Sequence, residues 1–128
     1  MVARVQNKGL ANITAAWHAS ATRCRHLQWG TGSAAAASAN AVTTTSTTEA
    51  RTAGTTAQAT TTQTDDTLRL TGTITAAGVR AITEIGAFDD AGSGSPPTGG
   101  NMGLYADFAV INLASGDSIA FTIDVAIT

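Results

Sequence analysis

Regular alternation of apolar and small or polar residues near the end of the chain constrains its fold more than any other sequence feature. In "SIAFTIDVAIT" (residues 118–128), large apolar side chains occupy every second position from Ile119 to Ile127. Successive side chains of an extended strand point to opposite faces, so this pattern predicts a half-buried β-strand. Its inward face is entirely large and apolar, and it therefore needs a second layer of structure to cover it.

Three further segments show the same alternation. They are "DTLRLTGTIT" (66–75), "RAITEIGAFD" (80–89) and "GLYADFAVINL" (103–113). The first places Leu68 and Leu70 on one face and threonines on the other, while the other two each slip once, as a β-bulge or a bend between sheets requires. A shorter strand is predicted in "CRHLQW", before the glycine turn in "GTGS".

A threonine-rich tract, residues 43–64, is either an unfolded linker or part of a folded sheet. Threonine is β-branched and favours extended backbone, whereas flexible linkers are rich in Gly, Ser, Pro and charge. Strands are therefore predicted near Thr47 to Ala53 and Thr55 to Thr62, joined by a turn at Gly54.

Residues near the start predict one short amphipathic helix. Leu10, Ile13 and Trp17 are three and four positions apart, and Asn7 is a candidate cap. Residues 1–8 are assigned to an N-terminal arm, which is either a frayed terminus or a strand that joins a neighbour.

These segments predict an all-β fold, an antiparallel jelly-roll-like β-sandwich of seven or eight strands with one short N-terminal helix. Residues 9–128 form a single domain, as expected for a chain of 128 residues. The predicted core comprises Leu68, Leu70, Ile74, Ile82, Ile85, Phe88, Leu104, Phe108, Val110, Leu113 and the apolar face of the last strand.

Composition argues against several classes of partner. Charged residues make up 12% of the chain, against roughly 25% in an average protein, and the net charge is −2. A near-neutral surface leaves self-association or docking open. With only seven basic residues, the chain lacks the electrostatic signature of a nucleic-acid binder. No apolar run is long enough to span a bilayer and no secretory signal is visible, so we expect synthesis in the cytoplasm and no membrane contact.

The titratable side chains do not match a known catalytic or metal-binding pattern. The candidates are His18, His26, Cys24 and the acidic pairs Asp65–Asp66 and Asp89–Asp90. Neither histidine belongs to a nucleophile motif, the acidic pairs lack EF-hand spacing, and the single cysteine lacks zinc-ligand neighbours. We therefore expect no enzyme activity, no catalytic residues, no metal and no cofactor.

Three exposed regions are the predicted partner-binding sites. They are the N-terminal arm, two arginines that alternate on a predicted strand, and the loop "DDAGSGSPPTGGN" (89–101), which is rich in Gly and Pro. For the arginines, a solvated face is an equally good interpretation. The predicted residues are Val2, Arg4, Lys8, Arg23, Arg25, Asp89, Asp90 and Asn101.

An ordered set of motifs extends from about Asn7 to the end of the chain. These are "NKGLANIT", "WGTGSAAA", "EARTAGTT", "DTLRLTGTIT", "AITEIGAFD" and "FAVINLASGDSIAFTIDVAIT". The set resembles a family of small structural proteins of tailed bacteriophages. Its members share a WGTG-like turn, an acidic-arginine strand, an AITE-GLF-like strand and a closing INL-GDS-I-F-T segment.

The resemblance implies a virion component on the capsid surface. The favoured role is a capsid decoration (cement) protein that binds the outside of the assembled head and bridges subunits of the major capsid protein. Proteins of this kind are commonly trimers, so the resemblance also implies a homotrimer. The alternative is a tail, baseplate or fibre-associated protein with a receptor- or glycan-binding tip formed by Tyr105, Asp89, Asp90 and Asn101.

Overall fold

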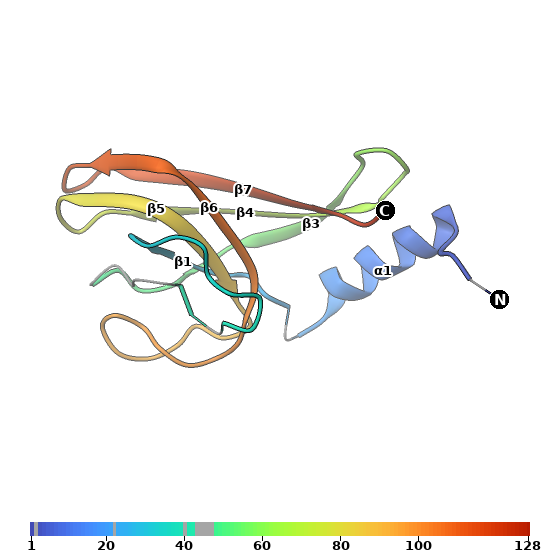
Figure 1. Cartoon of the computed structure of the whole chain (residues 1–128), viewed down its shortest axis with the longest axis horizontal. Helices are drawn as coiled ribbons and strands as arrows, with labels where there is room; N and C mark the ends of the chain where they lie inside the picture. Colours follow the sequence, from blue (N-terminus) through green and yellow to red (C-terminus); the bar gives the residue numbers. More distant parts are fainter. Residues whose placement is uncertain (2, 22, 40, 43–47) are drawn as a thin grey trace.

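The protein is a two-sheet β-sandwich with one helix (Figure 1). The structure, a computed structural model, describes residues 1, 3–21, 23–39, 41–42 and 48–128. Within these ranges the elements are α1 (Asn7–Ala19), β1 (His26–Gly30), β2 (Thr52–Ala53), β3 (Thr55–Ala59), β4 (Thr67–Thr75), β5 (Arg80–Phe88), β6 (Met102–Leu113) and β7 (Ser118–Ala126).

The two sheets differ in size. Sheet A has the strand order β2-β1-β5-β6 and sheet B has the order β3-β4-β7, with every pair antiparallel. This confirms the predicted all-β sandwich with a short N-terminal helix. The order of the strands does not confirm the jelly-roll part of the prediction. β6 and β7 are consecutive in the chain but end different sheets, so they form one long side of the sandwich together.

The pairing of β4 with β7 follows the predicted alternation. Leu70 lies opposite Ile123 on the inner face, and Thr71 lies opposite Thr122 on the outer face. The register is unbroken from Thr67 to Thr75, because the apolar sets of both strands must face sheet A together. The β5–β6 pair carries the predicted irregularity, with register shifts between Ile82 and Glu84 and beside Phe88.

The core is narrower than predicted. Most predicted core residues are buried, including Leu68, Leu70, Ile74, Ile82, Ile85, Phe88 and Leu113. However, Leu104, Phe108 and the inward residues of β7 are only half-buried, and Val110 is 54% exposed. Leu104, Phe108 and the β7 residues Ile119, Phe121 and Ile123 still pack against the buried cluster, so the core assignment was wrong only for Val110. These side chains stay half-exposed because β6 and β7 end their sheets, and no strand among the described residues covers that side.

Helix α1 packs on β3 and β4, alongside the part of sheet B that extends beyond sheet A (Figure 1). The Gln58 side chain donates from Nε2 to the Ala11 carbonyl (3.1 Å) and to Thr14 Oγ1 (2.9 Å). The buried side of the helix runs through Leu10 and Thr14, so the prediction that Ile13 is buried was wrong, and Ile13 is 40% exposed.

The N-terminus of α1 also differs slightly from the prediction. The N-cap is Gln6 rather than Asn7, whose side chain instead donates to Gln63 Oε1 (2.7 Å). Lys8, which was assigned to the arm, lies in the first turn of the helix.

The described part of the threonine tract, from residue 48 on, is folded, but not as the predicted hairpin. β2 pairs with β1 in sheet A, whereas β3 pairs with β4 in sheet B. Gly54 therefore marks a crossing between sheets, and a Cβ there would lie 2.6 Å from Leu70 Cδ1 and 2.7 Å from the Thr71 carbonyl oxygen. The predicted start at Thr47 lies outside the described residues.

β3 ends at Ala59, earlier than predicted, because Asp66 organises the residues that follow. Its buried carboxylate accepts backbone N–H bonds from Thr61 (2.9 Å), Thr62 (3.0 Å) and Gln63 (2.8 Å), and a hydroxyl bond from Thr67 (2.8 Å). These bonds favour the charged form and hold the pKa of Asp66 well below its usual range.

We predict that Asp66→Asn destabilises the fold more than Asp65→Asn, which makes the same charge change one residue earlier. Because the folded pKa of Asp66 is lowered, its stabilisation is complete above the ordinary carboxyl pKa and is lost as the pH falls below that value. Thermal unfolding between pH 2 and 7 checks this. The acid-side loss of stability should be smaller in Asp66→Asn than in wild type, and equal pH profiles would contradict the assignment.

Candidate partner-binding surfaces

The predicted partner loop, residues 89–101, is closed at its base by its own polar residues. Asn101 donates from its backbone N–H to Asp89 Oδ1 (2.7 Å) and from Nδ2 to Asp89 Oδ2 (3.0 Å). The Asp89 N–H donates in turn to the Asn101 carbonyl (3.1 Å), and Asp90 Oδ1 accepts from the Gly92 N–H. The backbone and side-chain bonds from Asn101 lower the pKa of Asp89. Asp89, Asp90 and Asn101, which were predicted to bind a partner, therefore form hydrogen bonds within the loop and fix its conformation.

Arg51, only 9% exposed, fixes this loop to sheet A. Its guanidinium donates from Nη1 to the carbonyls of Asp90 (2.9 Å) and Gly99 (2.8 Å), and from Nε to Gln28 Oε1 (2.9 Å). It also lies 3.6 Å from the centroid of the Phe88 ring. Burial lowers the pKa of Arg51, and nearby Asp90 and Asp89 oppose that effect. The loop is thus held in one shape before any partner arrives.

The structure brings together some of the predicted contact residues. Arg25 immediately precedes β1, and its backbone N–H donates to Phe88 at the end of β5, so it lies beside the base of the 89–101 loop. Burial and nearby Arg25 lower the pKa of His26, while Asp90 raises it. Burial and Asp89 raise the pKa of the neighbouring Cys24 thiol. This end of sheet A is a compact group of charged side chains.

Other predicted contact residues lie elsewhere. Arg23 turns back to donate from Nη1 to the Ser20 carbonyl (2.8 Å). Arg4 is exposed, and Lys8 lines a hollow of about 290 Å³ between α1 and residues 63–65. Val2 lies outside the described residues. The arm and the 89–101 loop are at separate ends of the molecule (Figure 1).

Sequence reasoning missed two buried carboxylates, of which Glu84 is the more enclosed. It is fully buried, accepting the hydroxyl of Tyr105 at Oε2 (2.9 Å) and the Gly32 N–H at Oε1 (3.1 Å). Nearby, Asp107 Oδ2 accepts the Ala34 N–H (2.9 Å). These bonds hold the loop after β1 against sheet A. The available signal was a glutamate within the otherwise apolar run "AITEIGAF".

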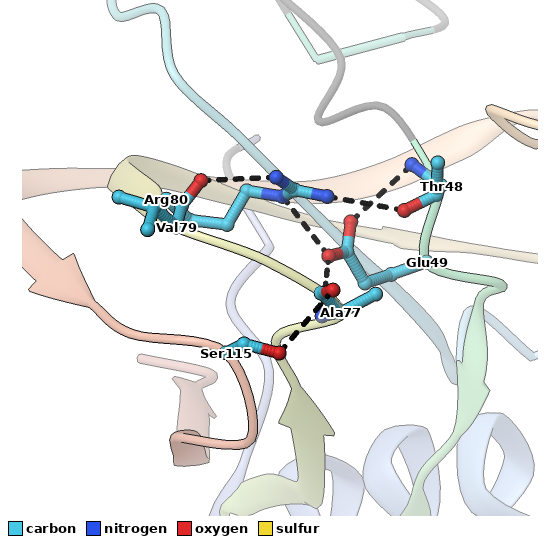
Figure 2. A network of polar contacts seen from close by, with 6 residues as sticks. All are labelled: Thr48, Glu49, Ala77, Val79, Arg80 and Ser115. Carbon is cyan, nitrogen blue, oxygen red and sulfur yellow. Dashed lines mark hydrogen bonds and ion pairs between the residues drawn. The ribbon is translucent and has the colours of Figure 1, made fainter.

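The second is Glu49, which lies in a polar network beside the turn between β4 and β5. Figure 2 shows its Oε1 accepting the Ala77 N–H (3.0 Å) and Arg80 Nε (3.0 Å), while Arg80 Nη2 donates to Thr48 Oγ1 (3.0 Å). The Glu49 side chain is 6% exposed, so this ion pair is largely shielded from water. It attaches the segment before β2 to the turn between β4 and β5, where Ser115 also contacts Ala77.

The outer face of sheet B is exposed, polar and nearly uncharged. Thr71, Thr73 and Thr75 occupy alternate positions of β4, and Thr75 shares a hydroxyl hydrogen bond with Ser118 on β7 (2.7 Å). The charges on this face cancel in a bidentate pair, in which Arg69 donates to both carboxylate oxygens of Asp124 (2.8 and 2.7 Å).

An apolar groove of about 480 Å³ opens between β6 and β7. Its lining includes Phe108 and Ile111 from β6, and Ile119, Phe121 and Ile123 from β7. The centroids of the Phe108 and Phe121 rings, one from each strand, are 6.1 Å apart.

We predict that Arg51→Lys loosens the 89–101 loop, because a lysine cannot reproduce the guanidinium fork that reaches Gln28, Asp90 and Gly99. The expected loss is roughly 2–4 kcal/mol in the free energy of unfolding, with faster amide exchange at Ser93 and Thr98. Arg69→Lys is the matched control on the exposed face and should change stability little. Denaturant unfolding with amide exchange checks both, and equal effects would contradict the role given to Arg51.

Comparison with known proteins adds no assignment: the sequence matches no protein-family model, no curated protein and no solved structure. Among the described residues, no three His, Cys, Asp or Glu side chains gather closely enough to hold a metal ion. The single helix in the described ranges is too short and too polar to cross a membrane.

Proposed function

We propose that this protein is a virion structural protein, a capsid decoration protein that binds the outside of an assembled phage head and bridges major capsid protein subunits. The resemblance of its motifs suggested this role. The structural observation that best supports it is the separation of the two predicted contact regions, the arm with Arg4 and the 89–101 loop (Figure 1). A protein that bridges two subunits needs two contact regions that face different neighbours.

The 89–101 loop, which is held in one conformation, suits such a contact. Because Arg51 and the Asp89–Asn101 bonds already fix its backbone, little conformational entropy is lost when it docks. Once one region binds a capsid subunit, the second binds its neighbour as an effectively intramolecular step. Because the protein binds the assembled lattice and not the isolated subunit, its binding free energy adds to the stability of the lattice by mass action. The lattice then resists the outward load of packaged DNA better.

The alternative, a glycan-binding tip, gains no support from the side chains proposed for it. Tyr105 donates its hydroxyl to buried Glu84, and Asp89 and Asn101 bond to each other. A glycan would have to compete with these internal bonds.

We predict that deleting residues 1–5 weakens binding to phage heads by about tenfold or more, because one of the two contact regions is lost. This deletion retains Gln6, whose carbonyl accepts the first N–H bonds of α1, so the helix should remain folded. Cosedimentation with heads that lack the protein measures the affinity, with thermal unfolding as the control for folding.

Antibody labelling of intact particles tests the location separately. We expect label on the head surface, and label confined to the tail would contradict the capsid assignment. Unchanged affinity after the deletion would contradict only the role of the arm.

A further inference from the structure

One long side of the sandwich, formed by β6 and β7, is uncovered. Each strand is hydrogen-bonded on one side only, since β6 ends sheet A and β7 ends sheet B. Val110 and Ile111 on β6 are 54% and 39% exposed, and every inward residue of β7 is only half-buried. The apolar groove of about 480 Å³ runs between the two strands.

The other sheet edges are protected by familiar means. β2, at the far edge of sheet A, is only two residues long, and β3, at the far edge of sheet B, packs against α1. β6 is neither short nor covered by a helix: apart from the register shift between Asp107 and Ile111, it is a 12-residue strand containing no proline or lysine and a single charged residue, Asp107. Monomeric proteins rarely leave a long, apolar, uncharged edge exposed, because it pairs readily with another strand. This side therefore has the character of an interface.

We propose that the edge is covered by a second copy of the chain, with the two β6 strands running antiparallel about a two-fold axis between Ala109 and Val110. In that register Phe108 lies opposite the partner's Ile111, and both residues line the groove of their own subunit. Asp107 lies opposite the partner's Asn112, so the charge on each strand meets an amide rather than its own copy. If Asp107 instead faced its own copy across the axis, the two carboxylates would repel each other.

The size of the edge is sufficient for a specific dimer. In this register residues 106–113 of the two strands lie opposite each other; these eight extended residues span about 27 Å, and two sheets about 10 Å apart give the edge a width of roughly 20 Å with side chains included. Each subunit would thus bury on the order of 550 Å², or about 1,100 Å² in total, which passes the lower limit of about 1,000 Å² for a specific interface. Sheet A would continue across the axis, and the two grooves would merge into one apolar core.

This inference does not depend on the proposed function. It concerns the protein in free solution, whereas the capsid role concerns the arm and the 89–101 loop. It also differs from the three-fold assembly implied by the phage resemblance, because an edge pairing with itself closes at two subunits.

The test compares two exposed valines changed to the same residue. Val110→Lys places two like charges beside the two-fold axis, so we expect a dimer dissociation constant raised by about 100-fold or more. Val79→Lys is the matched control: Val79 is 82% exposed and lies in the turn between β4 and β5 rather than on β6. Sedimentation equilibrium should find wild type and Val79→Lys at twice the chain mass and Val110→Lys at the chain mass, with unchanged circular dichroism.

A second measurement needs no variant. Diluting the wild-type protein through the dissociation constant should speed amide exchange in β6, while exchange in β4, which is paired on both sides, should not change. A wild type that stays monomeric at high concentration, a dimer unaffected by Val110→Lys, or a trimer would each overturn the proposal. So would protection of β6 that appears only on phage heads, which would identify a capsid subunit as the occupant.

Discussion

The structure depends on the antiparallel pairing of β4 with β7. One unbroken register runs from Thr67 opposite Ala126 to Thr75 opposite Ser118, with apolar residues inside and hydroxyl-bearing or small residues outside. Because side chains alternate strictly along a strand, a one-residue slip would turn Leu70 and Ile123 into solvent. Burial of this face against Leu27, Trp29 and Ile85 of sheet A forms the core. The polar outer face of sheet B follows from the same alternation.

Buried charged groups then hold the loops on this frame. Asp66 gathers the turn after β3, Arg51 attaches the 89–101 loop, and Glu84 attaches the loop after β1. Each is buried and hydrogen-bonded, and removing one would leave polar partners without bonds in a shielded site. A chain with so few charges thus places several of them where they organise backbone rather than surface. The same arrangement explains why loop residues that were predicted to be exposed partner contacts mostly form hydrogen bonds within the chain.

Period-two patterns predicted the four long strands of the C-terminal half within one residue or two of their observed ends. Two other predictions failed for identifiable reasons. The buried side of α1 runs through Thr14 rather than Ile13, because Gln58 of β3 and the Asp65 carbonyl in the turn between β3 and β4 form hydrogen bonds with that threonine. At Gly54 the chain crosses between the two sheets instead of forming the predicted hairpin. The apolar and polar faces of the threonine tract differ too little to specify a partner strand.

The sequence by itself determined the strand-forming segments, the faces that turn inward on β4 and β7, and the near-neutral surface, because alternation and composition are local properties of the chain. Only the tertiary structure decided which strands end the sheets. Sheet order depends on long-range pairing that no single segment encodes. It is that order which leaves β6 and β7 together on one open side, with a fully apolar strand face only half covered.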